Sequence, residues 1–388
     1  MRGQRFQNVS LCFGGKQALS LIGVVCFLWA FVFSSGAFAR PAVFSPSFFS
    51  TVSGALWVSA SLPVRKIKKL KVDQLRPGRY HFIFKAGLDN GGLPMWVPVI
   101  VIKGKNKGPK LMLTAAIHGD ELNGIRTIHQ LMDKISPDDL AGSIIAIPGV
   151  NRSGMSRHSR YFHDASGGGS VVDLNRVMPG RKTGNAGERF AYSLWQHVLK
   201  DNADIAIDLH TQTRGTVYPL YVFADFNNQT SKEMAFLLGP DVIKQDTGLT
   251  GTLETSFMTV GVPAVTFEIG APKVFQKKLV ARAVAGIRRV MQAQGMLTNL
   301  SPATAVPAPK VQPFVGKKIT TIKAHTGGIL VVNVKLLDRV KAGQIVGCLY
   351  DAFGVKLKCY KAPHNSLVLA LATDPLREAG SMVVRLLR

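Results

Sequence analysis

The chain has 388 residues, of which 46% are hydrophobic and 18% are charged. This length and composition exclude a disordered or fibrous protein and are enough for one large α/β domain plus a smaller one. The formal net charge of +25 favours anionic partners, such as envelope polymers, lipid headgroups or carboxylate substrates. Basic residues scattered over a solvated surface are the simpler explanation of this charge. No aromatic and basic motif accompanies it, so we expect no nucleic-acid partner.

The first 39 residues have the pattern of a secretory signal peptide. Three basic residues among the first sixteen precede an apolar run over 18–33, which is followed by Ala37-Phe38-Ala39. A basic start, an apolar middle and an A-x-A site predict cleavage after Ala39 and export, to the periplasm in the simplest case. The alternative is a membrane anchor formed by residues 18–39, because about 20 apolar residues span a bilayer.

Cysteine usage is compatible with export but does not establish it. Two of the four cysteines lie in the leader, and the others are Cys348 and Cys359. These two fall on adjacent predicted strands, so they could form a disulfide in an oxidising compartment or remain separate thiols.

After an N-terminal extension over 40–74, apolar runs bounded by Gly and Pro alternate with helical patterns. The runs predict strands at 96–102, 111–117, 143–147, 205–209, 218–224 and 264–269, and the periodicity predicts helices at 121–134, 187–199 and 273–294. The alternation predicts an α/β domain over 75–300, with a mostly parallel or mixed sheet flanked by helices. Residues 301–314 are rich in Pro and Ala and predict a linker. Short β runs over 315–388 predict a small all-β domain.

The strongest local signal is His118-Gly119-Asp120-Glu121, where a predicted strand turns into a helix. On the first turn of a helix, side chains three residues apart can converge on one metal ion. A catalytic zinc usually takes three protein ligands and keeps one position open, and His210, just after another predicted strand, is the candidate third ligand. Each histidine could instead be a structural hydrogen-bonding residue.

One carboxylate stands in the apolar run Thr266-Phe267-Glu268-Ile269-Gly270. A buried carboxylate needs a metal, a cation or a solvated cleft beside it. Next to zinc, Glu268 could take a proton from water and deliver it to a leaving nitrogen. A buried salt bridge to Arg or Lys is the alternative role.

The segment Asp173-Leu174-Asn175-Arg176 follows a Gly-rich loop and has Arg157 and Arg160 upstream. Arg suits bidentate recognition of a carboxylate, and Asn adds directed hydrogen bonds. The segment is therefore a candidate substrate clamp, although an ordinary polar loop has the same composition.

These four motifs resemble, in order and approximate spacing, those of the succinylglutamate desuccinylase/aspartoacylase family of zinc carboxypeptidase-like hydrolases, over roughly residues 75–297. The resemblance implies a zinc carboxypeptidase-like fold with one Zn²⁺ per chain on His118, Glu121 and His210. It also implies that Glu268 is the general base and acid and that Asn175 and Arg176 bind a substrate carboxylate. Arg160 resembles the arginine that stabilises the oxyanion, with Arg157 as a nearby competitor for this role.

One departure concerns the substrate. Aspartoacylases hold the acyl carboxylate with an additional Arg shortly before the catalytic Glu, but residues 255–265 contain no Arg. Arg214 is the candidate substitute, so neither N-acetylaspartate nor succinylglutamate follows as the substrate. The C-terminal segment resembles a small barrel-sandwich-like domain of the biotinyl or lipoyl type, but no lysine has the context of a modified carrier, and we expect a structural or access-shaping role.

Three functional hypotheses follow. The first is an exported zinc-dependent deacylase that hydrolyses the amide of an N-acyl amino acid or a related carboxylate-bearing amide. The second is a zinc peptidase acting on peptides such as cell-wall stem peptides, which export and positive charge favour. The third is a non-catalytic binding protein, against which the intact set of His118, Glu121, His210 and Glu268 counts. The sequence does not predict an oligomeric state.

Overall fold

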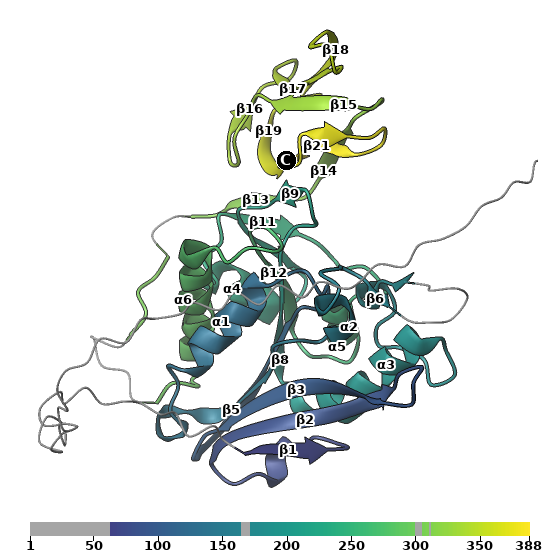
Figure 1. Ribbon diagram of the computed structural model, residues 1–388. Helices are drawn as coiled ribbons and strands as arrows, with labels where there is room; N and C mark the ends of the chain where they lie inside the picture. The colour runs from purple at the N-terminus through teal and green to yellow at the C-terminus, as the bar shows by residue number, and fades with distance from the viewer. Residues whose placement is uncertain (1–62, 164–170, 299–304, 310–311) are drawn as a thin grey trace, which may run out of the picture. The chain divides into compact units, whose positions relative to one another are not determined.

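A mixed sheet of ten strands is the main element of the computed structural model, which describes residues 63–163, 171–298, 305–309 and 312–388 (Figure 1). In spatial order its strands are β1 (Val64–Ile67), β2 (Gly78–Leu88), β3 (Pro94–Lys103), β5 (Ala141–Ile147), β4 (Asn106–Ala115), β8 (Ile205–His210), β12 (Ala264–Ile269), β10 (Leu220–Ala224), β11 (Val242–Gln245) and β13 (Phe314–Gly316). Neighbours are parallel from β5 to β12 and antiparallel at β2·β3, β3·β5 and β12·β10. The predicted mixed sheet is confirmed. The signal-peptide and anchor predictions fall outside the described residues.

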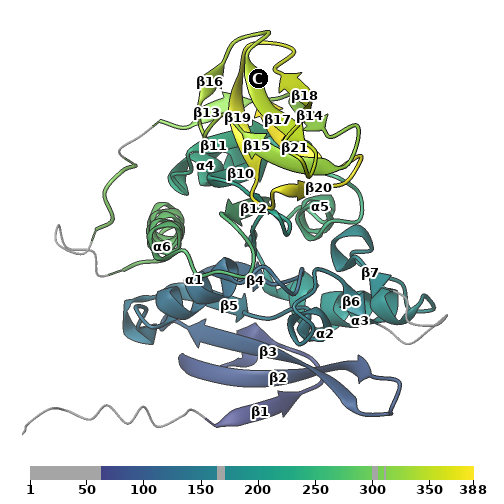
Figure 2. The same ribbon diagram turned by 45° about the horizontal axis from the view of Figure 1, so that its top comes forward.

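Helices cover both faces of this sheet (Figure 2). One apolar cluster contains residues of α1 (Asn123–Met132), α4 (Gln229–Leu237) and α6 (Lys277–Ala293), and a second contains residues of α3 (Ala186–Leu194) and α5 (Leu253–Thr259). Both clusters draw on the same strands, because successive side chains point to opposite faces: in β4, Leu111 and Leu113 belong to the first cluster and Met112 to the second. The short elements of this part are α2 (Arg152–Met155), β6 (Phe162–His163), β7 (Val171–Val172) and β9 (Thr216–Val217).

The same alternation places the candidate site on one face of the sheet. In β8, Ile205, Ile207 and Leu209 enter the cluster of α1, α4 and α6, which turns Asp208 and His210 to the opposite face. In β12, Val265, Phe267 and Ile269 also enter the cluster of α1, α4 and α6. Thr266 and Glu268 therefore lie on the same face of the sheet as Asp208 and His210. His210 and Glu268 are register partners on these parallel strands.

Most of the predicted elements occur with shifted ends, and the shift at Glu121 matters. The predicted helix over 121–134 is α1, Asn123–Met132, so Glu121 lies in the turn before the helix and not in its first turn. A backbone hydrogen bond from Glu121 N to His118 O, 3.2 Å long, closes this turn. The predicted helix over 187–199 is α3, which continues into a π-helical turn at Trp195–Leu199. Strands β1, β2 and β11 and helices α4 and α5 have no counterpart among the predicted elements.

The C-terminal region is all β, as predicted. Its strands are β14 (Ile319–Lys323), β15 (Gly328–Val332), β16 (Arg339–Val340), β17 (Ile345–Tyr350), β18 (Lys356–Lys361), β19 (Ser366–Ala372), β20 (Leu376–Arg377) and β21 (Met382–Leu387). They form the sheets β14-β21-β19-β16 and β18-β17-β15-β20, and a disulfide joins Cys348 of β17 to Cys359 of β18. Strand β13 pairs with β11 of the large sheet. The chain therefore leaves the large sheet at Gly316. This point lies just inside the segment 315–388 that the sequence predicted as the β domain. Within the described residues no helix is long and apolar enough to span a membrane.

Candidate active site

The turn that carries His118 and Glu121 requires a glycine between them. A Cβ on Gly119 would stand 2.3 Å from the backbone carbonyl carbon of Gly154, a distance that no side chain can tolerate. The close approach lets the turn pack on the C-terminal half of α2, and Gly119 N donates a hydrogen bond to Arg160 O at 3.3 Å. The glycine thus brings the metal-ligand turn and the arginine segment together.

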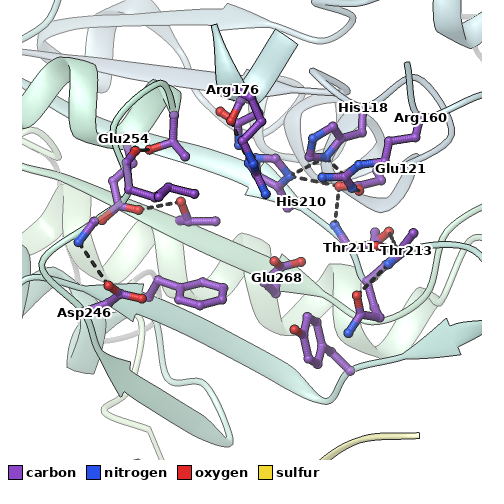
Figure 3. Close-up of a pocket in the computed structure, with 18 of the residues that line it drawn as sticks. His118, Glu121, Arg160, Arg176, His210, Thr211, Thr213, Asp246, Glu254 and Glu268 are labelled. Carbon is purple, nitrogen blue, oxygen red and sulfur yellow. Dashed lines mark hydrogen bonds and ion pairs between the residues drawn. The ribbon is translucent and has the colours of Figure 1, made fainter. Parts of the chain in front are cut away.

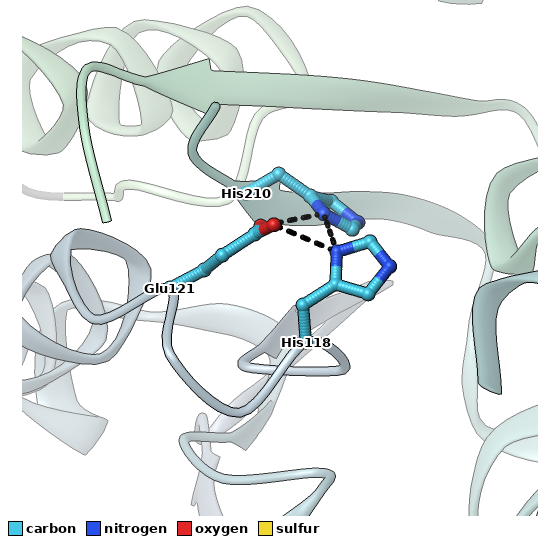
Figure 4. A group of neighbouring side chains, drawn as sticks. All are labelled: His118, Glu121 and His210. Carbon is cyan, nitrogen blue, oxygen red and sulfur yellow. Dashed lines mark hydrogen bonds and ion pairs between the residues drawn. The ribbon is translucent and has the colours of Figure 1, made fainter. Parts of the chain in front are cut away.

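Three candidate metal ligands converge at this turn (Figure 4). His118 Nδ1 lies 2.8 Å from Glu121 Oε1, His210 Nδ1 lies 3.0 Å from Glu121 Oε2, and the two Nδ1 atoms are 3.2 Å apart. All three side chains are buried, with residue exposures of 3% or less. Sequence reasoning singled out these three residues, and the structure brings them together.

The outer nitrogens of both imidazoles face carboxylates. His118 Nε2 lies 3.1 Å from Asp173 Oδ1, and His210 Nε2 lies 2.7 Å from Asp208 Oδ2. Donation of both Nε2 protons to these carboxylates leaves two Nδ1 lone pairs directed at each other, an arrangement that a cation between them stabilises. Two nitrogens and one carboxylate are the ligand set that zinc prefers in catalytic sites. These residues therefore fit a divalent metal.

Glu268 stands beside the ligands as a buried carboxylate. It is 8% exposed, and its Oε2 has no hydrogen-bond partner among the described residues. Burial, supported by the charge of Glu121, raises the pKa of Glu268 to about 8, although His210 and Arg160 act in the opposite direction. No salt bridge to Arg or Lys in the described part of the chain holds this carboxylate, contrary to the alternative considered from the sequence.

Arg160 reaches the metal ligands. Its Nη1 donates to Glu121 Oε1 at 3.1 Å, and its Nε and Nη2 donate to Asp173 Oδ2 at 3.2 Å. Its competitor Arg157 is exposed and donates to Ser153 O. The structure thus places Arg160, and not Arg157, at the site.

Asn175 and Arg176 lie on a short 3-10 turn over Leu174–Arg176. Asn175 is buried, its Oδ1 accepts a hydrogen bond from Leu253 N at 2.8 Å, and its Nδ2 is 3.5 Å from His210 Nε2. The Arg176 guanidinium donates to the Asn175 carbonyl oxygen at 2.7 Å and lines the pocket. Asn175 therefore fastens α5 to the site in addition to contributing to its wall.

A pocket of about 310 Å³ opens over these residues (Figure 3). Seven of the eight predicted site residues line it, whereas the eighth, Arg214, is exposed and does not. Sequence reasoning missed several lining residues, among them Gln212, Tyr218, Asp246, Glu254 and Arg385. Glu254 is buried and accepts a hydrogen bond from Thr266 Oγ1 at 2.7 Å. Of these residues, Arg385 had a usable signal, because it is the one charge in the apolar run Met382–Leu387.

Two characterised enzymes are similar to this chain in sequence. The chain is 25% identical over 284 residues to the N-alpha-acetyl-L-2,4-diaminobutyric acid deacetylase of Halomonas elongata, a match that covers 71% of this chain and 80% of that protein. It is also 25% identical over 213 residues to the succinylglutamate desuccinylase of Pseudomonas aeruginosa, covering 51% of this chain but only 58% of the desuccinylase.

Solved structures share the fold. The product-bound ectoine utilization protein EutE (DoeB) from Ruegeria pomeroyi superposes with a TM-score of 0.70 at 22% identity, covering 81% of this chain and 96% of that one. A succinylglutamate desuccinylase/aspartoacylase from Rhodobacter sphaeroides gives 0.68 at 19% identity, with 82% and 98% covered. Residues 107–294 match the model of the succinylglutamate desuccinylase/aspartoacylase catalytic domain. This part of the chain is therefore similar in sequence to the catalytic domain of the succinylglutamate desuccinylase/aspartoacylase family.

Proposed function

We propose that this protein is a zinc-dependent deacylase that hydrolyses the amide bond of an N-acyl amino acid or a related carboxylate-bearing amide. The convergence of His118, Glu121 and His210 beside the unpaired carboxylate of Glu268 carries this proposal. A metal site with a carboxylate next to it is what amide hydrolysis by activated water requires. The related deacetylase and desuccinylase both carry names of enzymes that remove an acyl group from nitrogen.

The size of the pocket favours a small substrate. Its volume of about 310 Å³ is at the lower end of the range for small-molecule sites, roughly 300–1,000 Å³. An acylated amino acid fits this space better than an extended peptide. This observation supports the deacylase over the peptidase.

Glu268 has the properties that a proton carrier needs here. His118, Glu121 and His210 would hold one zinc ion per chain, which would supply Lewis-acid chemistry for the water and the substrate carbonyl. A carboxylate held beside the metal ligands without a hydrogen-bond partner of its own can take a proton and return it within one cycle. Glu268 therefore accepts the proton of the attacking water and delivers it to the leaving nitrogen.

Arg160 and Arg176 serve the two negative charges of the reaction. The guanidinium of Arg160 has five N–H donors, and three hydrogen bonds to Glu121 and Asp173 leave donors for the carbonyl oxygen as it becomes negative. Arg176 lines the pocket beside Asn175, where it binds the carboxylate of the amino-acid part. These roles rest on position and on the chemistry of guanidinium groups.

The experiment combines metal analysis with an amide-hydrolysis assay. The purified protein is analysed for zinc and incubated with N-acyl amino acids and with cell-wall stem peptides, with and without a chelator. Chelator-sensitive release of a carboxylate from N-acyl amino acids, with about one zinc per chain, supports the deacylase. Release from peptides alone supports the peptidase, and a protein with neither zinc nor turnover is a binding protein.

The site of action in this proposal is outside the cytoplasm. The leader pattern of residues 1–39 supports export, and the disulfide between Cys348 and Cys359 suits an oxidising compartment. The high positive charge suits association with the anionic cell envelope. Fractionation of cells producing the full chain, followed by N-terminal sequencing, tests both export and cleavage after Ala39. A cytoplasmic product with an intact leader contradicts this part of the proposal.

A further inference from the structure

One sheet of the C-terminal β domain has an apolar face that the described residues leave exposed. In the sheet β18-β17-β15-β20 (Figure 2), Leu330 of β15 belongs to the core of the domain, so its neighbours Ile329 and Val331 point to the opposite face. Both are exposed there, and Leu376 of β20, which pairs with Ile329, is 69% exposed. Tyr350 of β17 pairs with Ile329 from the other side. The exposed apolar surface therefore runs across three strands.

The disulfide lies on the same face and joins the two strands of the β17–β18 hairpin there. Cys348 is the register partner of Val331 on one side and of Cys359 on the other. Further along β17, Ile345 is also exposed and pairs with Lys361, which lies on the Cys359 side of β18. The apolar face consists of Ile329, Val331, Ile345 and Leu376, with Phe353 and Val355 of the hairpin turn.

The turn of the β17–β18 hairpin holds a phenylalanine in solvent. Phe353 is 93% exposed, and Val355 is exposed as well. The Oδ1 atom of Asp351 accepts hydrogen bonds from Phe353 N at 2.9 Å and from Val355 N at 2.8 Å. Two backbone hydrogen bonds, from Gly354 N to Asp351 O and from Asp351 N to Val355 O, close the turn. The aromatic ring is therefore presented outward by a turn of defined geometry.

Three exposed lysines of β18 border the apolar face. Lys356 and Lys361 are register partners of residues on this face, and Lys358 lies between them in the strand. All three are exposed, and none has an ion pair among the residues that the structure describes. The hairpin over 345–361 contains one acidic residue, Asp351, whose carboxylate accepts the hydrogen bonds of the turn. The hairpin therefore presents a net positive charge next to apolar side chains.

Contiguous apolar side chains bordered by cations are complementary to an anionic lipid surface. Single exposed apolar residues are common on proteins, but a contiguous patch marks an interaction site. At a bilayer, aromatic and aliphatic side chains enter the boundary between headgroups and acyl chains, and lysines are attracted to the anionic headgroups.

A second copy of this chain is a poorer match for the apolar face. A two-fold contact over this face would bring the same three lysines of β18 close to one another, and like charges in a contact are repulsive. In addition, β18 is an edge strand of its sheet, and lysines on an edge strand oppose strand pairing between chains. The charges therefore favour a lipid surface over self-association.

We propose that the apolar face of the β domain docks on the surface of a membrane that contains anionic lipids. Phe353 and Val355 insert into the bilayer boundary, and the three lysines of β18 contact the headgroups. Arg385, which lines the candidate pocket, belongs to the other sheet of the domain, so docking uses a different sheet from the one that reaches the pocket. The inference goes beyond the proposed hydrolysis and does not rest on it.

The first test measures binding of the full chain to lipid vesicles by co-sedimentation. Vesicles of phosphatidylcholine are compared with vesicles of equal parts phosphatidylcholine and phosphatidylglycerol, which we expect to bind the protein more tightly and in a salt-sensitive manner. Phe353→Ser should weaken binding to the anionic vesicles roughly tenfold, because an apolar side chain loses its contact with the bilayer. Joint replacement of Lys356 and Lys358 by Gln should weaken it about 25-fold, roughly fivefold for each lysine.

A second measurement reports on the hairpin itself. It is needed because the apolar run of residues 18–33 could enter a bilayer wherever the leader is retained. Phe353→Trp keeps an aromatic side chain in the turn and should bind vesicles as the wild type does. In vesicles that contain brominated lipid, which quenches tryptophan fluorescence inside the bilayer, this variant should lose more fluorescence than the wild type.

Phe275 provides the matched control. It is an exposed phenylalanine closely followed by Lys277 and Lys278, but it lies outside the β domain. Phe275→Ser should bind vesicles as the wild type does, and Phe275→Trp should show no added quenching. Denaturant unfolding of every variant checks that the fold is intact.

The outcomes separate the possible occupants of the apolar face. Equal losses in Phe353→Ser and Phe275→Ser, or no added quenching in Phe353→Trp, overturn the proposal. Dimerisation in light scattering that Phe353→Ser abolishes assigns the face to a second copy and also overturns it. Hairpin-dependent vesicle binding without hydrolysis of any amide refutes the proposed function alone. Amide hydrolysis with vesicle binding that is unchanged in Phe353→Ser refutes this inference alone.

Discussion

Glu268 and His210 are register partners on the parallel strands β12 and β8. The pairing sets the carboxylate proposed to carry protons one strand away from a candidate metal ligand, on the same face of the sheet. Because both residues belong to strands of the sheet interior, their separation is determined by backbone hydrogen bonds and not by loop conformation. A pair of side chains held in this way does not depend on a substrate for its geometry.

Replacement of Glu268 by Gln removes the proton carrier and keeps the shape of the side chain. Zinc content is expected to stay at the wild-type level, because Glu268 is not one of the converging ligands. The turnover number is expected to fall by roughly 10²–10⁴, the usual contribution of general acid–base catalysis. Metal analysis and steady-state kinetics on the same preparation check both parts. A fully active, zinc-loaded Glu268→Gln protein shows that another group moves the proton.

The carboxylate of Asp208 orients the imidazole of His210, which is a candidate metal ligand. It accepts hydrogen bonds from Thr114 Oγ1 at 2.6 Å and from His210 Nε2 at 2.7 Å. We expect Asp208→Asn to weaken zinc binding roughly 10- to 100-fold, as loss of such an outer partner usually does. Chelator competition measures the zinc dissociation constant. Asp201→Asn, at an exposed ion pair with Lys69, is the control and should bind zinc as the wild type does.

The metal-ligand residues could be predicted because their signals are local. A strand end followed by His-Gly-Asp-Glu, and a second strand ending in His210, place donors where the strands of an α/β sheet end. The start of α1 could not be predicted to the residue, since the turn at Glu121 depends on close packing of Gly119 against Gly154, a contact between distant segments. The three candidate ligands thus converge as the sequence predicted, although α1 begins two residues later than expected.

The sequence alone could not place Arg385 at the pocket that it lines. Arg214 is close in sequence to His210, which made it the natural candidate, but it lies at an exposed turn. Arg385 comes to the pocket through the pairing of β19 with β9, and nothing in a single sequence states which domain surfaces meet. A lone charge in an apolar strand, which singled out Glu268, is the one local feature that marks Arg385.

The buried carboxyl of Glu254 should make stability depend on pH. Burial raises its pKa to about 8, with Asp246 and Asp208 contributing in the same direction and the hydrogen bond from Thr266 opposing. The folded state thus binds a proton more tightly than the unfolded chain, so the stabilisation from this group is complete below about pH 4.5 and is lost as the pH rises through 8. The whole difference is on the order of 5 kcal/mol at full ionisation.

Glu254→Gln removes that dependence, because the amide stays neutral. We expect the variant to be close to the wild type in free energy of unfolding at pH 5 and more stable by a few kcal/mol at pH 8 to 9. Chemical denaturation at both pH values measures the difference. Glu233→Gln, at an exposed helix position, should show no such change between the two pH values. Equal effects of Glu254→Gln at pH 5 and pH 8 would contradict a raised pKa.

The disulfide between Cys348 and Cys359 joins β17 and β18, in the sheet of the β domain that does not contain β21. It closes a loop with a sequence separation of 11 residues, for which chain entropy predicts about 2–3 kcal/mol of stabilisation. Double replacement by Ser should lower the free energy of unfolding of the β domain by about this amount.

Treatment with a reductant separates the effect of losing the disulfide bond from the effect of replacing the two cysteine side chains. It should destabilise the wild type to the level of the Cys348→Ser, Cys359→Ser variant and leave that variant unaffected, as followed by denaturant unfolding. Arg385 is held at the pocket through β21, β19 and the contacts at Gly215. While the domain stays folded, turnover should therefore be the same in the oxidised wild type, the reduced wild type and the double variant. A loss of turnover on reduction, with folding intact, would mean that the hairpin of β17 and β18 also shapes the pocket.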